Sequence, residues 1–346
     1  MTRARRFFPG YAGGFSLVEI MIALTLSLLL LGAVFQIFIS AKASYRMNEG
    51  LAQIQETGRF ATDLLASAIR MAGYQGCMTL DQITPHIIVA NPPADLQIYD
   101  PANVITGQND LAASNTLGAV AGSDSLTIRG ASAVGARLTG NMSADNANIQ
   151  IDSNPGGFKQ NDILMITDCA SADIFRATSV SNSSGSSTVT IAHADSTNTD
   201  NRLSKAYQGN ARVMQFIATT YFVKDTGRKN EAGDPIYSLY VQRLGGTPVE
   251  LATGVDSMQV LYGVDTNADG SVDEYVNAGA VTDFTDVISA RVALLVRSVE
   301  PTSTQPESAS YTLLDKTVTT DDRYLRKAFT LTATARNRSL RSTTFN

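Results

Sequence analysis

The sequence contains two cysteines, two histidines and no tryptophan, and its formal net charge is −5. This is too little Cys and His for a zinc ribbon or an iron–sulfur site. With a negative net charge, a basic nucleic-acid-binding surface is not the default interpretation, so we expect no nucleic-acid partner. Neither His86 nor His193 lies beside a G-x-S-x-G elbow or a metal-ligand spacing, and no glycine-rich phosphate loop follows a strand. We therefore do not expect this protein to be an enzyme, and we expect both histidines to lie at the surface or in loops.

Charge is also absent from residues 20–39, where only Thr25, Ser27 and Gln36 are polar. Twenty apolar residues form about 30 Å of helix, the thickness of a bilayer's hydrocarbon core. Three arginines precede this run, at positions 3, 5 and 6. The positive-inside rule keeps them in the cytoplasm, so the pattern predicts one membrane span with everything after Lys42 exported.

The residues before the apolar run exclude an ordinary signal peptide, whose small-residue cleavage site follows its apolar stretch. Here Gly13 and Gly14 come first, followed by Phe15 and then Glu19. This order resembles the class III leader of type IV pilins and of type II secretion pseudopilins. The resemblance implies that a prepilin peptidase removes residues 1–14, that the new amine of Phe15 is methylated, and that the protein lies in the inner membrane before entering the pilus.

Glu19 is unusual because a carboxylate deep in a bilayer costs roughly 2.5–3.5 kcal/mol. The helix dipole offsets part of this cost near the N-terminus. A neighbouring subunit could bring its own terminal amine against Glu19 as a filament assembles, which would favour assembly in register. The alternative is a carboxylate at the level of the lipid headgroups with no partner.

The helical period continues after the apolar run and predicts one helix over 15–73, ending at Gly73. Its second half carries an apolar stripe made of Leu51, Ile54, Ala61, Leu64, Leu65, Ala68, Ile69 and Ala72. The first half should lie in lipid or in a filament core, and the second half should pack on a soluble head. A free coiled coil is the alternative for the second half, although sustained heptads are absent.

Residues 74–346 have the composition of a β-rich head, so the predicted fold class is α+β, a long helix packed on an antiparallel sheet. Segments 103–122, 137–160 and 179–205 have the composition of loops or irregular strand edges, and no motif indicates the structure of 103–160. Strands are predicted at 125–129, 162–167, 187–191, 213–223, 236–243, 258–264, 288–299 and 328–335.

Cys77 directly follows the predicted helix and Cys169 follows a predicted strand. In an oxidising periplasm an even pair of cysteines should be bridged, which would tie the helix end to the sheet. Two buried free thiols are the alternative.

The stretches AGYQGC, DCASADIF, LYGVDTNADGSVDEYV and TLTATARNRS together resemble PilW-type minor pilins. This resemblance implies a structural subunit that helps to initiate or prime type IV pilus assembly, with other minor pilins and the major pilin as partners. Two alternatives stay open. One is a minor pseudopilin of type II secretion, similar to GspJ, and the other is an adhesive module at a filament tip.

One loop in the head resembles two-thirds of an EF-hand. Its oxygen-bearing side chains alternate around Gly270, which turns hard oxygens toward one point, but position twelve lacks the bidentate Glu. We therefore expect a candidate calcium site, with a plain acidic turn as the alternative because Asp-Gly favours hairpins. The candidate ligands are Asp265, Asn267, Asp269, Ser271 and Asp273.

Overall fold

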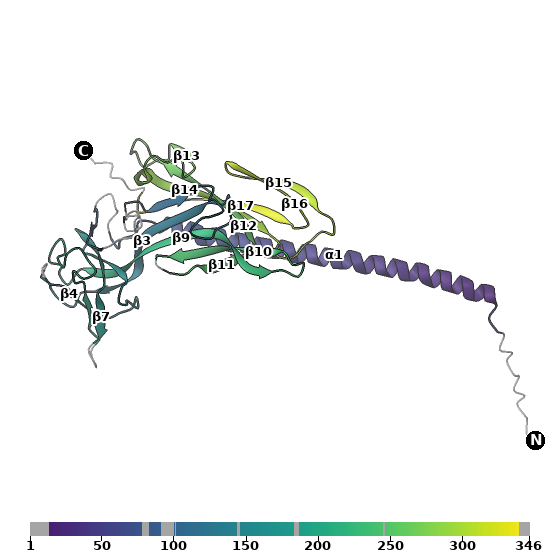
Figure 1. The fold of residues 1–346 in the computed structure, drawn as a ribbon, viewed down its shortest axis with the longest axis horizontal. Coiled ribbons are helices and arrows are strands. Elements are labelled where there is room, and N and C mark those ends of the chain that lie inside the picture. Colours follow the sequence, from purple (N-terminus) through teal and green to yellow (C-terminus); the bar gives the residue numbers. More distant parts are fainter. Residues whose placement is uncertain are drawn as a thin grey trace, which may run out of the picture. The chain divides into compact units, whose positions relative to one another are not determined.

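A computed structural model of the chain describes residues 14–77, 83–90, 100, 102–143, 146–182, 187–244 and 246–338. One long helix, α1 (Leu17–Arg70), precedes a strand-rich head (Figure 1). The strands are β1 (His86–Ile87), β2 (Ile105–Gln108), β3 (Ser125–Arg137), β4 (Asn148–Ile151), β5 (Ile163–Thr167), β6 (Ala172–Arg176), β7 (Ser179–Asn182), β8 (Val189–Ala192), β9 (Arg212–Lys229), β10 (Pro235–Arg243), β11 (Val249–Thr253), β12 (Val255–Val264), β13 (Glu274–Val276), β14 (Val287–Arg297), β15 (Glu307–Leu313), β16 (Lys316–Asp322) and β17 (Arg326–Thr334). A 3-10 helix, η2 (Phe284–Asp286), precedes β14.

The helix ends close to its predicted position. A turn follows Arg70, and Gly73 has a φ of 73°, the left-handed conformation that lets a glycine terminate a helix. The chain divides into two compact units, Met1–Glu49 and Gly50–Asn346, so the last turns of α1 belong to the same unit as the strands.

The strands form four sheets. The largest has eight strands in the order β1-β6-β5-β9-β10-β11, with β3 pairing β9 and β2 pairing β3. A four-stranded sheet has the order β13-β12-β14-β17, β4-β8-β7 form a third sheet, and β15-β16 form a hairpin. Within the described ranges, every strand pair is antiparallel except β1 with β6, which is parallel. The expected antiparallel sheet is therefore correct for most of the head but not for β1.

Each predicted strand overlaps an observed one, namely β3, β5, β8, β9, β10, β12, β14 and β17. The segments that were expected as loops or irregular edges hold the short strands β2, β4 and β7 as well. The alternation predicted for β17 is confirmed, since Thr330, Thr332 and Thr334 are exposed while Ala333 is buried.

The main core lies between α1, the eight-stranded sheet and the four-stranded sheet. Ile54, Leu65 and Ile69 of the predicted stripe are fully buried, but Leu51 is 39% exposed, contrary to the stripe. Two helix glycines, Gly50 and Gly58, are buried in its place. A Cβ at Gly58 would lie 2.4 Å from the Phe329 ring, so the absence of a side chain lets the helix approach β17 closely.

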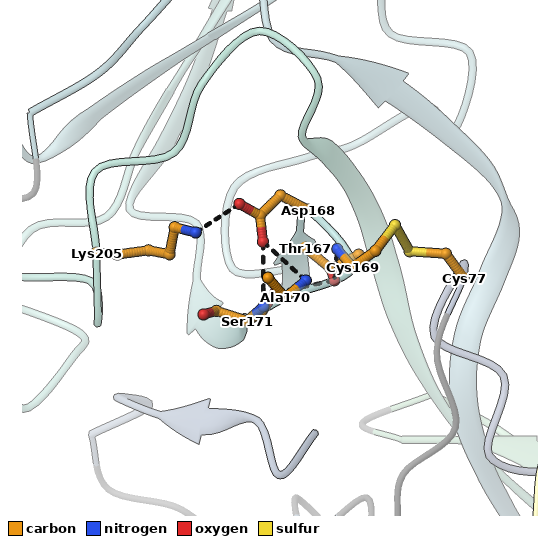
Figure 2. Close-up of a disulfide and its surroundings, with 7 residues drawn as sticks. All are labelled: Cys77, Thr167, Asp168, Cys169, Ala170, Ser171 and Lys205. Atoms are coloured by element: carbon orange, nitrogen blue, oxygen red, sulfur yellow. Dashed lines mark hydrogen bonds and ion pairs between the residues drawn. A yellow bond between two sulfur atoms is a disulfide. The ribbon is translucent and has the colours of Figure 1, made fainter. Parts of the chain in front are cut away.

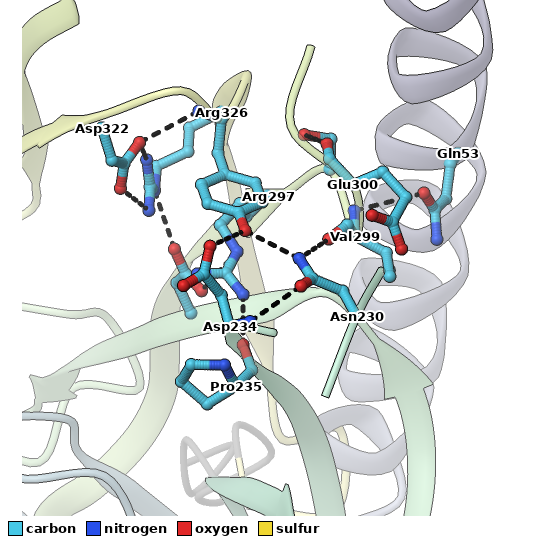
Figure 3. A network of polar contacts seen from close by, with 12 residues as sticks. Gln53, Asn230, Asp234, Pro235, Arg297, Val299, Glu300, Asp322 and Arg326 are labelled. Atoms are coloured by element: carbon cyan, nitrogen blue, oxygen red, sulfur yellow. Dashed lines mark hydrogen bonds and ion pairs between the residues drawn. The ribbon is translucent and has the colours of Figure 1, made fainter. Parts of the chain in front are cut away.

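A polar network fastens the helix to the strands (Figure 3). The Val299 amide donates to Gln53 Oε1 of α1 at 3.4 Å, and Asn230 Nδ2 donates to the Val299 carbonyl at 2.8 Å. Arg297 donates to the Pro235 carbonyl at 2.6 Å, which ties the end of β14 to the first residue of β10, next to the turn after β9. These contacts link α1, that turn and the end of β14 into one framework.

Asp124 joins the two large sheets from a buried position directly before β3. It is 1% exposed, and its carboxylate accepts the Asp110 and Val260 amides, both at 2.8 Å. Burial raises the pKa of Asp124 from 3.8 to about 6, with the nearby Asp110 and Asp315 adding to the rise. A carboxyl with a raised pKa in the folded state stabilises the fold when protonated, and this contribution is lost as the pH rises through about 6.

We therefore expect Asp124→Asn to flatten the pH dependence of stability. As the pH rises from about 4 to about 7, the wild type should lose about 2 kcal/mol of unfolding free energy relative to the variant. Urea denaturation of the full-length chain in mild detergent, repeated at several pH values, measures this difference. The test compares how the two unfolding free energies change with pH, so it does not depend on the absolute stability of the variant. Parallel curves for the two proteins would show that Asp124 does not titrate in this range.

Candidate functional site

The N-terminal part of α1 is long and apolar enough to cross a membrane. The side chains of this apolar stretch are not buried in the described chain. Its large apolar side chains are exposed, among them Leu29 at 72% and Ile37 at 69%. Two polar side chains in this stretch bond to the helix itself. Thr25 donates to the Ile22 carbonyl at 2.9 Å, and Ser27 to the Ala23 carbonyl at 2.7 Å. Both hydroxyls are thus satisfied without water.

Glu19 takes part in a capping box at the start of α1. The Glu19 amide donates to Ser16 Oγ at 3.2 Å, and the Ser16 amide donates to Glu19 Oε2 at 3.3 Å. This reciprocal pair satisfies two backbone amides that a helix start otherwise leaves unbonded. Glu19 therefore has a local role that the sequence analysis missed. The Ser-x-x-Glu spacing at Ser16 and Glu19 was the signal that could have found it.

Gly14 and Phe15 directly precede the capping box. Phe15 is 82% exposed, and no atom lies within 4 Å of the position that a Cβ would take at Gly14. A larger residue at position 14 would meet no contact in the described chain. A requirement for glycine there would consequently come from processing and not from folding. Residues 1–13 of the expected leader lie outside the described residues.

The predicted disulfide is present between Cys77 and Cys169 (Figure 2). Cys77 lies seven residues after the end of α1, and Cys169 lies in the turn between β5 and β6. The bridge therefore ties the segment that follows the helix to the eight-stranded sheet, as expected.

The turn that carries Cys169 is held by Asp168. Its Oδ1 accepts the Ala170 and Ser171 amides at 3.1 and 3.0 Å, and its Oδ2 accepts Lys205 Nζ at 2.6 Å. Partial burial opposes ionisation, but these hydrogen bonds, with that from Lys205 the strongest, lower the pKa of Asp168. Cys169 has a φ of 71°, an unusual conformation for a side-chain-bearing residue. The turn thus presents Cys169 in a fixed position.

The two histidines differ. His86 is half exposed, and its Nδ1 lies 2.8 Å from Oδ1 of the fully buried Asp173. His193 is fully buried with its ring centroid 5.2 Å from that of Phe175, and burial lowers its pKa. His193 does lie in a loop, directly after β8, but the expectation of a surface position is wrong for it, because the ring is buried against Phe175 of β6. Asp173 also accepts the Tyr207 hydroxyl at 2.6 Å, so this cluster ties β6 to the segment after β8.

The acidic loop closes on itself. Asp265 accepts the Asp269 and Gly270 amides at 3.1 and 2.8 Å. Asp269 accepts the Ser271 amide at 2.7 Å, and Asp273 accepts both the amide and the hydroxyl of Thr266. Across the described residues, no group of three or more His, Cys, Asp or Glu side chains is placed to hold a metal ion. As arranged here the residues form an acidic turn, and Asn267 joins it by donating to Asp273 Oδ1 at 3.2 Å.

Calcium binding by this loop stays a prediction. A carboxylate oxygen that accepts one amide has a second lone pair, so a small contraction of the loop could bring the oxygens around a cation. We expect millimolar calcium to raise the melting temperature of the full-length protein through binding to the folded state. Asp265→Ala combined with Asp269→Ala should abolish the rise. Equal melting temperatures in calcium and in chelator would show that the loop is an acidic turn that does not bind calcium.

One family model matches the chain. It is described as type IV pilus-assembly protein W, and it covers residues 220–337, about a third of the sequence. No curated protein matches. The matched region runs from within β9 to just beyond β17, so it includes the four-stranded sheet, the β15–β16 hairpin and most of the network in Figure 3. The match supports a role for this chain in type IV pilus assembly.

Proposed function

We propose that this chain is a minor pilin, a structural subunit that helps to initiate or prime assembly of a type IV pilus. In this proposal prepilin peptidase removes residues 1–14, residues 15–73 anchor the subunit in the inner membrane and then enter the filament core, and residues 74–346 form a periplasmic head. The observation that carries the proposal is the match of residues 220–337 to a pilus-assembly family.

Two features of the N-terminus support it. The exposed apolar surface of α1 needs either lipid or other helices to cover it. No atom of the described residues lies within 4 Å of a Cβ at Gly14, and this glycine precedes Phe15 at the junction where the class III resemblance puts cleavage. Other minor pilins and the major pilin are the proposed partners, since they carry helices of the same kind.

The proposal predicts the mature N-terminus. Mass spectrometry of protein from its own cells should find a chain that begins at methylated Phe15. Gly14→Leu should keep residues 1–14 attached, whereas the neighbouring Gly13→Ala should be processed normally. Gly14→Leu should not unfold the protein, because no atom lies within 4 Å of a Cβ at that position. A mature terminus elsewhere, for example after Ala43, would rule out the pilin assignment.

A type II secretion pseudopilin is the rival assignment, because it shares the leader and the anchoring helix. The description of the matched family favours the pilus. Deletion of the gene should therefore remove surface pili and leave protein secretion intact. Loss of secretion with normal pili would assign the chain to the secretion system.

A further inference from the structure

His193 is a fully buried imidazole whose ring nitrogens are not held by hydrogen bonds. Its ring centroid lies 5.2 Å from that of Phe175 on β6. Within the described chain, neither ring nitrogen has a hydrogen-bond partner of normal geometry. Buried polar groups are usually paired, because burial without a partner costs free energy. The neutral ring tolerates this position, whereas a protonated ring would place an unpaired charge in the core.

The ring lies where two sheets pack on each other. β8 is the central strand of the three-stranded sheet, between β4 and β7. Its residues Val189 and Ile191 belong to one hydrophobic cluster with Phe175 of the eight-stranded sheet. The His193 amide donates to the Ala147 carbonyl at 2.8 Å, directly beyond the first pair of β4 and β8. A charge on His193 would therefore fall between the three-stranded sheet and β6.

The three-stranded sheet is small enough to open by itself. Its strands have four residues each. Backbone hydrogen bonds join it to the end of β3, where the Thr139 amide donates to the Gln150 carbonyl and the Asp152 amide donates to the Arg137 carbonyl, both at 3.0 Å. Short elements with limited contacts open locally at a lower free energy than the whole domain. The main core, which contains no residue of this sheet, can stay folded meanwhile.

One buried carboxylate acts on His193. Asp173 lies on the same face of β6 as Phe175, and its negative charge favours protonation of His193. Its oxygens already accept the Ser204 hydroxyl at 2.7 Å and the Tyr207 hydroxyl at 2.6 Å. Burial of the ring is the larger effect and lowers the pKa of His193, against the opposing effects of Asp173 and of nearby backbone groups.

The other charged side chains around the ring do not offset its burial. β4 and β7 carry no ionisable side chain. In the segment after β8, Asp195 is exposed, and Lys205 is paired with Asp168 at 2.6 Å. Arg176 follows Phe175 on β6 and so lies on the opposite face of that strand.

We propose that His193 is an acid-sensitive switch, whose protonation opens the three-stranded sheet β4-β8-β7 while the main core stays folded. In the open state the ring reaches water and binds a proton as an ordinary histidine does, with a pKa of about 6.5. The folded state resists that proton, so the contribution of His193 to closure is complete above about pH 6.5 and is lost as the pH falls below it. Opening exposes the apolar side chains Ile149, Ile151, Val189 and Ile191.

The main core should respond to acid in the opposite direction. The raised pKa of Asp124 makes protonation favour the folded state, so the core gains stability as the pH falls through about 6. Acid should therefore loosen the three-stranded sheet selectively. This inference does not depend on the proposed function.

Hydrogen exchange of the full-length chain in mild detergent, followed by mass spectrometry between pH 7.5 and 5.0, tests the switch. After correction for the intrinsic exchange rate, the opening constant of the β4 and β8 amides should rise by up to about tenfold for each pH unit below about 6.5. The amides of β14, in the four-stranded sheet, are the internal reference and should show no such rise.

Variants identify the titrating group. His193→Phe keeps a ring beside Phe175 but cannot bind a proton, so opening of the sheet should lose its pH dependence. His193→Leu should do the same, in case a larger ring packs poorly. His86 is the chain's only other histidine, and its Nδ1 lies 2.8 Å from Asp173 Oδ1. His86→Asn is therefore the matched control and should keep the wild-type dependence. Only the slopes with pH are compared, so the absolute stability of each variant does not enter.

Three results would overturn the proposal. The first is a wild-type opening constant that does not change with pH, or one that changes equally in both His193 variants. The second is a dependence that disappears in His86→Asn alone, which would assign it to the contact between His86 and Asp173. The third is an equal rise for β14, which would show that acid unfolds the whole head and not the three-stranded sheet.

Discussion

Glu19→Ala is expected to remove the protein from pili while leaving its membrane insertion intact or improved. Insertion should improve because the variant no longer carries a carboxylate into the apolar part of the helix. Assembly should fail because the charge that would attract the terminal amine of a neighbouring subunit is gone. The measurements are the amount of this protein in sheared pilus fractions and its amount in the membrane fraction.

The capping box requires a matched set of variants. Glu19→Ala removes both the charge and the bond to the Ser16 amide, and loss of a helix cap alone costs about 0.5–2 kcal/mol. Glu19→Gln keeps a capping side chain but removes the charge, since glutamine also serves in this box. Ser16→Ala removes the hydroxyl that caps the Glu19 amide but keeps the charge.

The proposed role predicts that Glu19→Ala and Glu19→Gln both fail to assemble and that Ser16→Ala assembles. If Glu19→Gln assembles normally and Ser16→Ala does not, the residue serves the helix start and not the filament. Normal piliation in Glu19→Ala would show that this carboxylate has no role in assembly.

The sequence predicted those elements whose signal is local. Continuous apolar runs and clean alternation specify β14 and β17, and Gly73 marks the helix end. The cysteine pair was predictable because two thiols have only one possible intramolecular partner each in an oxidising compartment, which is where the sequence analysis expected the head to lie. By contrast, the β15–β16 hairpin is rich in Ser, Thr and Asp and mostly exposed, so its strands carry no strong hydrophobic pattern.

The errors arose where distant residues decide burial. The predicted apolar stripe on α1 includes Leu51, but Leu51 is exposed and the neighbouring Gly50 is buried instead. Gly50 is buried because Ser298 and Thr302, about 250 residues later in the chain, pack against the helix at that position. His193 lies in a polar stretch of the sequence, yet it is fully buried with its ring beside that of Phe175. The parallel pairing of β1 with β6 likewise depends on a contact that no local pattern indicates.

The disulfide should contribute substantially to head stability. It links residues 92 positions apart, and closing a loop of that length stabilises the fold by about 4–5 kcal/mol in the chain-entropy model. Cys77→Ser is therefore expected to lower the unfolding free energy of the full-length protein by about that amount. Urea denaturation in mild detergent measures the loss, and non-reducing peptide mapping of the wild type should recover Cys77 joined to Cys169.

The fold itself should survive this change, because other bonds hold both ends of the bridge. The Gly73 amide donates to the Arg129 carbonyl at 2.9 Å, and the Ala131 amide donates to the Tyr74 carbonyl at 2.6 Å, so β3 retains the helix end. β5 stays paired with both β6 and β9, and Asp168 still holds the turn around residue 169. The loss should then come mainly from the unfolded chain, which regains the freedom that the bridge removed.

Because the expected loss comes from the unfolded chain, the other cysteine variants serve as controls. Cys169→Ser and the double variant should each cost as much as Cys77→Ser, because all three remove the same constraint. A double variant that costs clearly more than either single one would instead indicate separate packing roles for the two residues. Alkylation of both thiols in the native exported protein would show that the bridge does not form in the cell.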